Sequence, residues 1–219
     1  MSLPNASGSA ASGSNSGSAS RDAAYFLEPV VFKVEDALFQ VPRHHFAANP
    51  VFSTIFTLSP PEGSPVEGSS EANPFVLERI SKKDFQAFLS VLYPLTIPHS
   101  YSNTTAEEWK SVLVLSTMWE FQSLRDLAVQ TLGSPGVLDP VSKILLGAKH
   151  DIPEWFISGC VELVTRPKGP RAEEVDLLGA DTAIKIYDLR EGRIEAQIRR
   201  YNFDARARVK AEFQNVLGP

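Results

Sequence analysis

Histidine and cysteine are the side chains in this sequence best suited to bind a metal or to attack a substrate. The sequence contains His44, His45, His99, His150 and a single cysteine, Cys160. Zinc ligands usually recur with spacings such as H-x₃-H or C-x₂-C, and neither spacing occurs here. Cys160 falls on the same expected helical face as Phe156 and Leu163, which favours a buried, unreactive thiol. We therefore predict no metal site and no cysteine nucleophile.

Motifs for phosphate binding and acyl transfer do not occur in the sequence. The glycines form neither G-x-x-x-x-G-K nor G-x-G-x-x-G, and no G-x-S-x-G elbow occurs. The paired carboxylates Glu107-Glu108 and Glu173-Glu174 fall at expected helix starts, where the helix dipole favours negative charge. These observations predict a protein that is not an enzyme and needs no cofactor.

Charge is distributed unevenly along the chain. Residues 190–210 contain seven basic and three acidic side chains, so this stretch carries +4 in a chain of formal net charge −5, and the remainder carries −9. Oppositely charged residues three or four positions apart favour a solvated helix for this stretch. The acidic remainder argues against nucleic acid as a partner. A nucleic-acid-associated regulator that acts through residues 190–210 is kept as an alternative function.

The sequence also indicates a compartment. One cysteine cannot form an internal disulfide, and no apolar run approaches the roughly 20 residues that cross a bilayer. Residues 1–20 carry neither the charge nor the apolar run of a secretory signal. We expect a cytoplasmic or nuclear protein, or one present in both compartments, that does not enter a membrane.

Two low-complexity segments separate the ordered parts of the chain. Residues 1–22 are rich in serine, glycine and alanine and predict a disordered tail. Residues 57–74 are rich in proline and contain three glutamates, which predicts an acidic surface loop inside a domain. The C-terminal residues 201–219 are expected to form a tail.

The segments between the loops predict an α+β domain followed by helices. Alternating apolar residues favour a hairpin of strands at 30–34 and 38–41, with a third strand at 75–80. Ser81 and Thr105 open two helices with capping-box patterns, and a third helix ends at Gly133 as its C-cap. From Asp139-Pro140 onward the pattern is helical throughout, which predicts a helical extension over residues 137–200.

The order of these elements resembles the BTB/POZ family, and one run of residues carries most of the likeness. That run comprises Phe32-Lys-Val34, Leu38-Phe39-Gln-Val41, Pro42-Arg43, Phe46-Ala47-Ala48, Asn49-Pro-Val-Phe52 and Phe56. The expected helices from Phe85 to Tyr93 and from Trp109 to Leu132 are similar to those that follow in the family. The likeness is to divergent members from mushroom-type fungi. It implies a BTB/POZ-like domain over residues 23–133, a small sheet flanked by a helical cluster.

The resemblance implies a protein-interaction module that self-associates or acts as an adaptor. A homodimer would use the first helices, and the interface residues that we predict are Arg43, Phe46, Val51 and Phe52. An alternative that the family suggests is a substrate adaptor of a cullin-type ubiquitin ligase, with the cullin scaffold as partner. The sequence departs from the family pattern where Leu95 to Asn103 lack the hydrophobic-x-Glu motif and where no N-terminal exchanged element precedes the sheet.

Overall fold

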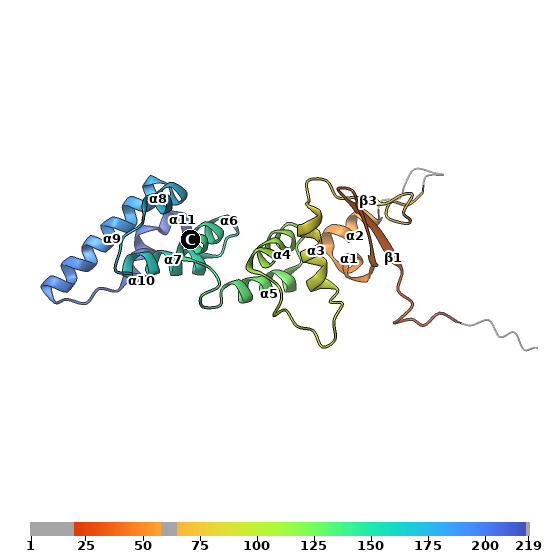
Figure 1. The fold of residues 1–219 in the computed structure, drawn as a ribbon, viewed down its shortest axis with the longest axis horizontal. Coiled ribbons are helices and arrows are strands. Elements are labelled where there is room, and N and C mark those ends of the chain that lie inside the picture. The colour runs from red at the N-terminus through yellow and green to blue at the C-terminus, as the bar shows by residue number, and fades with distance from the viewer. Residues whose placement is uncertain (1–19, 58–64, 218–219) are drawn as a thin grey trace, which may run out of the picture.

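The computed structural model describes residues 20–57 and 65–217, which form two lobes placed end to end (Figure 1). The first lobe spans residues 20–133 and contains a three-stranded sheet and five helices. The second lobe spans residues 138–217 and is built of six helices. The predicted α+β class, with a small sheet flanked by helices and followed by a helical extension, is confirmed.

The sheet is centred on the strand with the most apolar sequence. β1 (Pro29–Val34) pairs antiparallel with β2 (Ala37–Pro42), as the alternating pattern predicts. β3 (Phe75–Val76) pairs parallel with β1 on its other side, so the strand order is β2-β1-β3. The third strand is shorter than the predicted 75–80, because the chain turns away at Arg79, whose φ is 61°.

Five helices complete the first lobe. They are α1 (His44–Ala48), α2 (Pro50–Thr57), α3 (Lys82–Leu92), α4 (Ala106–Met118) and α5 (Gln122–Leu132). Thr105 and Glu108 form the predicted capping box at the start of α4, and Ser81 accepts a hydrogen bond from the Asp84 amide at the start of α3. Gly133 follows α5 as predicted but keeps a helical φ of −73°. It is small because the Trp155 indole lies where a side chain would point.

The core of the first lobe is largely aromatic. Phe32 from β1 packs against Phe46 from α1 with ring centroids 4.7 Å apart, and Phe46 packs against Phe52 at 4.9 Å. Rings from α3 and the end of α4 close this core, and all of these side chains are buried. Each such ring removes about 150–250 Å² of surface from water, so these residues dominate the stability of the lobe.

The second lobe contains more ordered chain than the sequence predicted. Its helices are α6 (Pro140–Lys149), α7 (Pro153–Thr165), α8 (Ala172–Leu178), α9 (Ala180–Arg199), α10 (Ala205–Glu212) and α11 (Gln214–Leu217). We expected residues 201–219 to be a tail. Val209 in α10 and Phe213, directly after α10, are instead buried in the same core as α7 and α9. The helical extension therefore continues to residue 217.

The two lobes share a core. Ile152 and Trp155, at the start of α7, are buried in one cluster with Trp109, Val112 and other side chains of α3, α4 and α5. The Arg125 side chain in α5 donates a hydrogen bond of 2.9 Å to the carbonyl of His150 at the end of α6. The extension therefore packs directly on the domain that precedes it.

Both predicted low-complexity segments fall partly outside the described residues, namely residues 1–19 of the tail and 58–64 of the acidic loop. Residues 65–74 return along the sheet, since the Val31 amide donates to the Gly68 carbonyl at 2.9 Å. Gly68 has φ +79°, and a Cβ there would lie 2.9 Å from Val30. Glycine is therefore required where this part of the loop rests on β1.

Candidate protein interface

The four predicted interface residues lie together on α1 and α2, but two of them face inward. The side chains of Phe46 and Phe52 are buried in the aromatic core and are not available to a partner. Val51 is half-buried against the same core. Arg43, just before α1, places its guanidinium carbon 4.4 Å from the centre of the Phe56 ring. Of the four, Arg43 and Val51 remain at the surface.

The pair α1–α2 is held in place by one buried amide. Asn49 accepts hydrogen bonds from the Val51 and Phe52 amides, which caps α2, and it donates to the Trp119 carbonyl at 2.8 Å. The sequence placed Asn49 in the family-like run without indicating this role. Because a buried polar group must be hydrogen-bonded, Asn49 fixes α2 on the end of α4.

A cavity of about 330 Å³ opens beside Arg43 and Phe56. Val30 and Val66 contribute apolar surface to it, and two carboxylates, Glu28 and Glu67, also line it. The arginine held over the aromatic ring stiffens one wall, because a cation over a ring face is attracted to it. The arrangement is a small hollow with both apolar and acidic walls.

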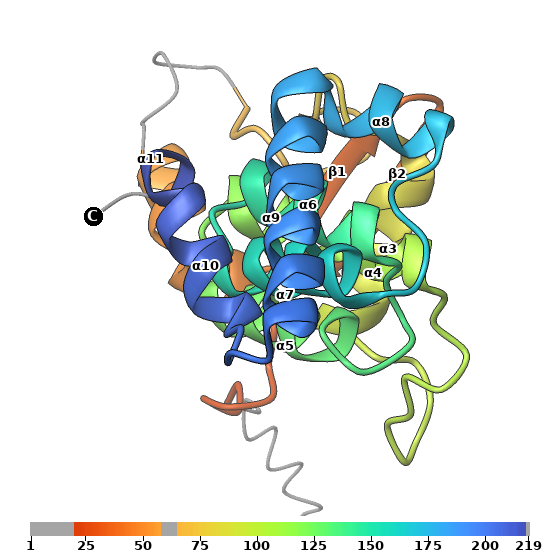
Figure 2. The same cartoon turned by 90° about the vertical axis from the view of Figure 1, so that its left-hand side faces the viewer.

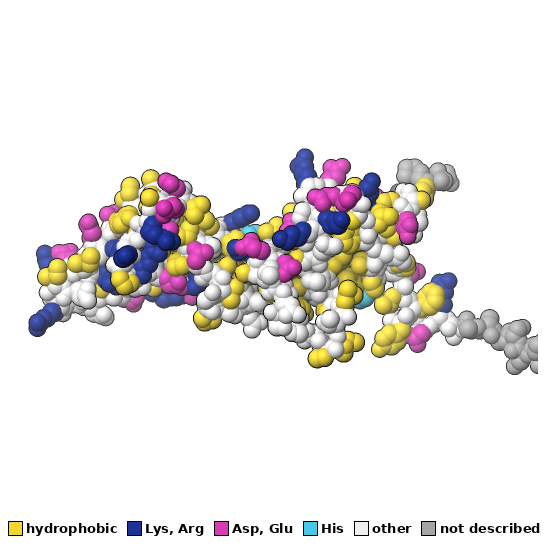
Figure 3. All heavy atoms as spheres, in the orientation of Figure 1, with side chains coloured by type: hydrophobic (Ala, Val, Ile, Leu, Met, Phe, Trp, Pro, Cys, Tyr) yellow, Lys and Arg dark blue, Asp and Glu magenta, His cyan; other side chains and the backbone are white. Residues whose placement is uncertain are grey.

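Three apolar residues stand exposed where the chain enters this region. Tyr25 is 86% exposed, and Phe26 and Leu27 are exposed as well. Asp22 accepts hydrogen bonds from the Ala24 and Tyr25 amides, so the segment forms an ordered turn. In Figure 3 this segment stands away from the sheet at the right of the molecule. Sequence reasoning missed these residues because a short apolar triplet has no periodicity.

A second exposed apolar feature is the connection between α3 and α4. Leu95 is 97% exposed and Ile97 is 95% exposed. Figure 3 shows hydrophobic side chains at the lower tip of this connection. This segment is the one that lacks the hydrophobic-x-Glu motif of BTB/POZ proteins. Nothing in the sequence except the residue types of Leu95 and Ile97 indicated that their side chains would be exposed.

The histidines and the cysteine lie in different parts of the molecule. Burial raises the pKa of the Cys160 thiol to about 12, so the reactive thiolate does not form near neutral pH. The rings of His44 and His45 contact each other at the surface beside Tyr93, tilted by 45°, and partial burial lowers the pKa of His45. Within residues 20–57 and 65–217, no three metal-binding side chains converge. His150, at the junction of the lobes, is buried next to Arg125 and Lys149, which with burial lower its pKa.

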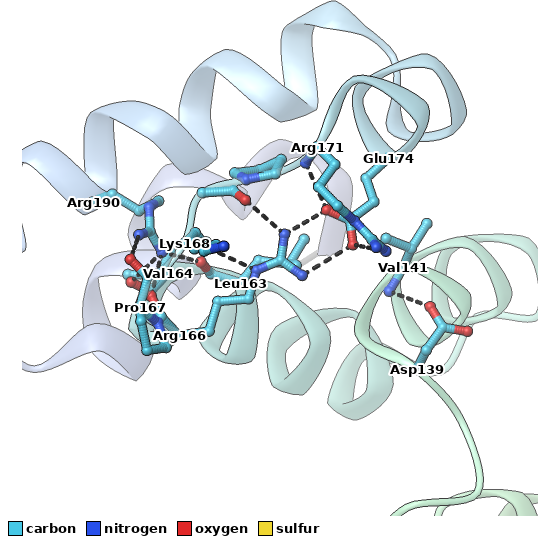
Figure 4. A network of polar contacts seen from close by, with 12 residues as sticks. Asp139, Val141, Leu163, Val164, Arg166, Pro167, Lys168, Arg171, Glu174 and Arg190 are labelled. Carbon is cyan, nitrogen blue, oxygen red and sulfur yellow. Dashed lines mark hydrogen bonds and ion pairs between the residues drawn. The ribbon is translucent and has the colours of Figure 1, made fainter.

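Four of the seven basic residues of the stretch 190–210 contact other residues of the second lobe, and Figure 4 shows one of them, Arg190. The Arg190 guanidinium donates to the carbonyls of Leu163, Val164, Arg166 and Pro167 at the end of α7. Arg193 donates to the Thr165 carbonyl at 2.8 Å. Arg206 pairs with Glu154, and Arg199 pairs with Glu195 on α9. Helix carbonyls without an internal partner need such donors, so Arg190 and Arg193 have structural roles.

The first turn of α8 contains a buried carboxylate, Glu174, that forms ion pairs with two arginines. Arg166 forms two hydrogen bonds to the Glu174 carboxylate, one of them 3.0 Å long. The Arg171 amide donates to the same carboxylate at 2.7 Å. These contacts hold the pKa of Glu174 at about 2, with Arg166 as the main cause. The network joins α7, α8 and the loop between them.

Comparison with protein-family models and with curated proteins found no match for this chain. The BTB/POZ resemblance therefore stays a prediction that rests on the residues given above. In the described part of the chain, no helix has the length and hydropathy needed to span a membrane.

Proposed function

We propose that the chain is a non-catalytic protein-interaction module that self-associates through the surface around Arg43. The observation that carries the proposal is the exposed triplet Tyr25–Leu27, which leads into a cavity with an apolar wall that it does not fill. Protein interfaces combine an apolar centre with a polar rim, and this surface has both.

A second copy of the chain is the occupant that fits this surface. In a two-fold dimer each copy presents the same surface, so the triplet of one copy and the cavity of the other meet twice. The charges are complementary as well. Arg21, stacked on Phe26 at 4.5 Å, comes with the triplet, while Glu28 and Glu67 line the cavity.

Sedimentation equilibrium of the full chain tests this proposal. The full chain is used because a fragment that ended at residue 200 would lose the buried side chains Val209 and Phe213. We expect a concentration-dependent dimer that Phe26→Ser and Val66→Asp each weaken at least tenfold. Leu95→Ser, which changes an exposed apolar side chain elsewhere on the lobe, is the control and should leave the dimer intact. A monomer at several hundred micromolar would refute self-association.

A second candidate, a substrate adaptor of a cullin-type ubiquitin ligase, is supported by one observation. The connection between α3 and α4 presents Leu95 and Ile97 almost fully to solvent, and the helical extension packs on α5 nearby through Trp155. Titration of the full chain with the N-terminal helices of a cullin scaffold tests it. Binding that Leu95→Asp abolishes would support the adaptor, and no binding of the unchanged chain would remove it.

The structure gives less support to the nucleic-acid alternative. Arg190, Arg193 and Arg206 are committed to carbonyl or carboxylate oxygens inside the second lobe. Phosphate contacts are sensitive to salt, so nucleic-acid binding through residues 190–210 should appear at low salt and weaken steeply as salt is added. We expect no binding of nucleic acid in a filter assay at roughly 50 mM salt, a low salt concentration at which phosphate contacts are strong.

A further inference from the structure

The outer face of α9 carries an apolar stripe that no described element covers. Ile184, Tyr187, Ile194 and Ile198 are 58%, 41%, 50% and 76% exposed. They fall at positions i, i+3, i+10 and i+14, so they line one face of the helix over about 21 Å. Figure 2 shows α9 at the surface, in front of α6 and α7.

This stripe is separate from the one that attaches α9 to its lobe. Ala183, Ile186, Leu189 and Ala196 are buried on the inner side of α9. Attachment to α7 therefore leaves the outer stripe without a role in the fold. The Tyr187 hydroxyl donates to the Pro170 carbonyl at 2.7 Å, so this side chain has a role within the fold. The three isoleucines have no comparable contact to explain them. Single exposed apolar residues are ordinary, but a regular row is the mark of a binding face.

Acidic side chains follow the stripe along its length. Asp188, Glu191 and Glu195 are exposed, and Glu191 occupies the stripe position between Tyr187 and Ile194. Glu195 pairs with Arg199 at 2.7 Å. Among the described residues, Asp188 and Glu191 form no ion pair. The centre of the stripe is therefore negatively charged.

The central acids decide which partner fits. If a second copy paired antiparallel about Glu191, that residue would face its own copy, and Asp188 would lie near Glu195. If it paired in parallel, each acid would lie beside its equivalent. Like charges at such positions destabilise paired helices. Phosphate backbones and anionic lipid surfaces are disfavoured for the same reason.

We propose that the outer face of α9 is a docking site for an amphipathic helix of another protein, one with lysine or arginine along its apolar stripe. The apolar row would contact Ile184, Ile194 and Ile198. The flanking basic side chains would lie near Asp188 and Glu191. This site is on the opposite lobe from the proposed self-association surface, so the two can be tested separately.

Two designed 21-residue peptides, a length chosen to span about 30 Å as a helix, provide the probes. Both carry leucine at the stripe positions. One has lysine on the flanks and the other has glutamate. Fluorescence anisotropy with the full chain should show saturable binding of the lysine peptide, at least tenfold tighter than that of the glutamate peptide. Added salt should reduce this preference.

Variants locate the binding on α9. Ile194→Ser should weaken the binding of the lysine peptide at least fivefold. The matched control Ile97→Ser, in the exposed connection between α3 and α4, should leave this binding unchanged. Glu191→Lys should shift the preference toward the glutamate peptide. Equal binding of both peptides, absence of binding, or binding that Ile194→Ser leaves unchanged would each overturn the proposal. Loss of self-association in Ile194→Ser would also overturn it, since the occupant would then be a second copy.

Discussion

In the first lobe, aromatic rings fill the core and charged side chains remain at the surface around α1 and α2. In the second lobe, the Arg166–Glu174 pair and the Arg190 guanidinium tie the helices together, while isoleucines of α9 face outward. Charged side chains are therefore part of the framework of the second lobe, although both lobes have an apolar core. Residue type alone does not show which apolar side chains are buried, since Ile186 is buried and Ile194 is exposed on the same helix.

The difference follows from the element types in each lobe. A small sheet needs a dense apolar layer on its faces, and Phe32, Phe46 and Phe52 supply it. Helix ends instead leave carbonyls without partners, and arginine can donate to several of them at once. In the second lobe the carbonyls at the end of α7 lie within reach of Arg190 and Arg193 on α9, so arginine becomes part of its framework.

The largest expected effect comes from the aromatic core. Phe46→Ala should lower the free energy of unfolding by about 3–5 kcal/mol, because it removes a ring that touches Phe32 and Phe52. Urea denaturation followed by tryptophan fluorescence measures this loss. Val51→Ala, at a half-buried position, should cost less than half as much. If Phe46→Ala lowered the free energy of unfolding by less than about 1 kcal/mol, the Phe46 side chain would have to be exposed, as the predicted interface requires.

Glu174→Gln should produce the next largest effect, and the effect should depend on pH. The folded pKa of about 2 lies below the ordinary 4.5, so the carboxylate stabilises the fold fully above about pH 4.5. This stabilisation is lost as the pH falls toward 2. We expect the variant to lose about 2–3 kcal/mol at neutral pH, where Arg166 is left without its carboxylate.

The pH profile distinguishes the ion pair from a simple packing defect. The unchanged chain should lose stability relative to Glu174→Gln as the pH is lowered from 4.5 toward 2, so that the two denaturation curves converge. Glu173→Gln, at an exposed neighbouring position, serves as the control and should keep the full pH dependence. Parallel curves for the unchanged chain and Glu174→Gln across this range would contradict the assignment.

The first lobe was the more predictable from sequence. The hairpin of β1 and β2 and the caps at Ser81 and Thr105 were predicted because alternation and capping act over a few residues. The inward position of Phe46 and Phe52 could not be fixed in this way. Both faces of a short helix can be apolar, and only the packing of α1 and α2 on the sheet decides which side is buried.

The second lobe was less predictable because its decisive contacts join distant residues. Arg190 reaches carbonyls more than 20 positions away, and Arg206 reaches Glu154. Local spacing in the sequence favours solvated pairs instead, and within residues 190–210, all of which the structure describes, the Arg199–Glu195 pair follows that pattern. Residues 205–213 have few apolar side chains, so their burial on α7 left only Val209 and Phe213 as a signal.

Arg190→Gln should have an intermediate effect. The change removes donors to the carbonyls at the end of α7. A hydrogen bond from a charged group contributes about 1.5–3 kcal/mol net, and the Arg190 side chain is partly exposed, so a loss of about 1–2 kcal/mol is expected. Thermal unfolding measures the loss. Arg208→Gln, at an exposed position on α10, should stay within about 0.5 kcal/mol of the unchanged chain. Equal effects of the two changes would mean that Arg190 is also a solvated residue.

The smallest change in the free energy of unfolding is expected for substitutions in the outer stripe of α9. Ile194→Ala should change the free energy of unfolding by less than about 0.5 kcal/mol, because the side chain is half exposed and alanine favours helix more than isoleucine does. Ile186→Ala, on the buried side of the same helix, should cost about 2–5 kcal/mol. An apolar row that the fold does not need for its own stability is free to serve binding. If Ile194→Ala instead cost more than about 1 kcal/mol, the stripe would belong to the core of the second lobe, and the contrast between its two faces would be lost.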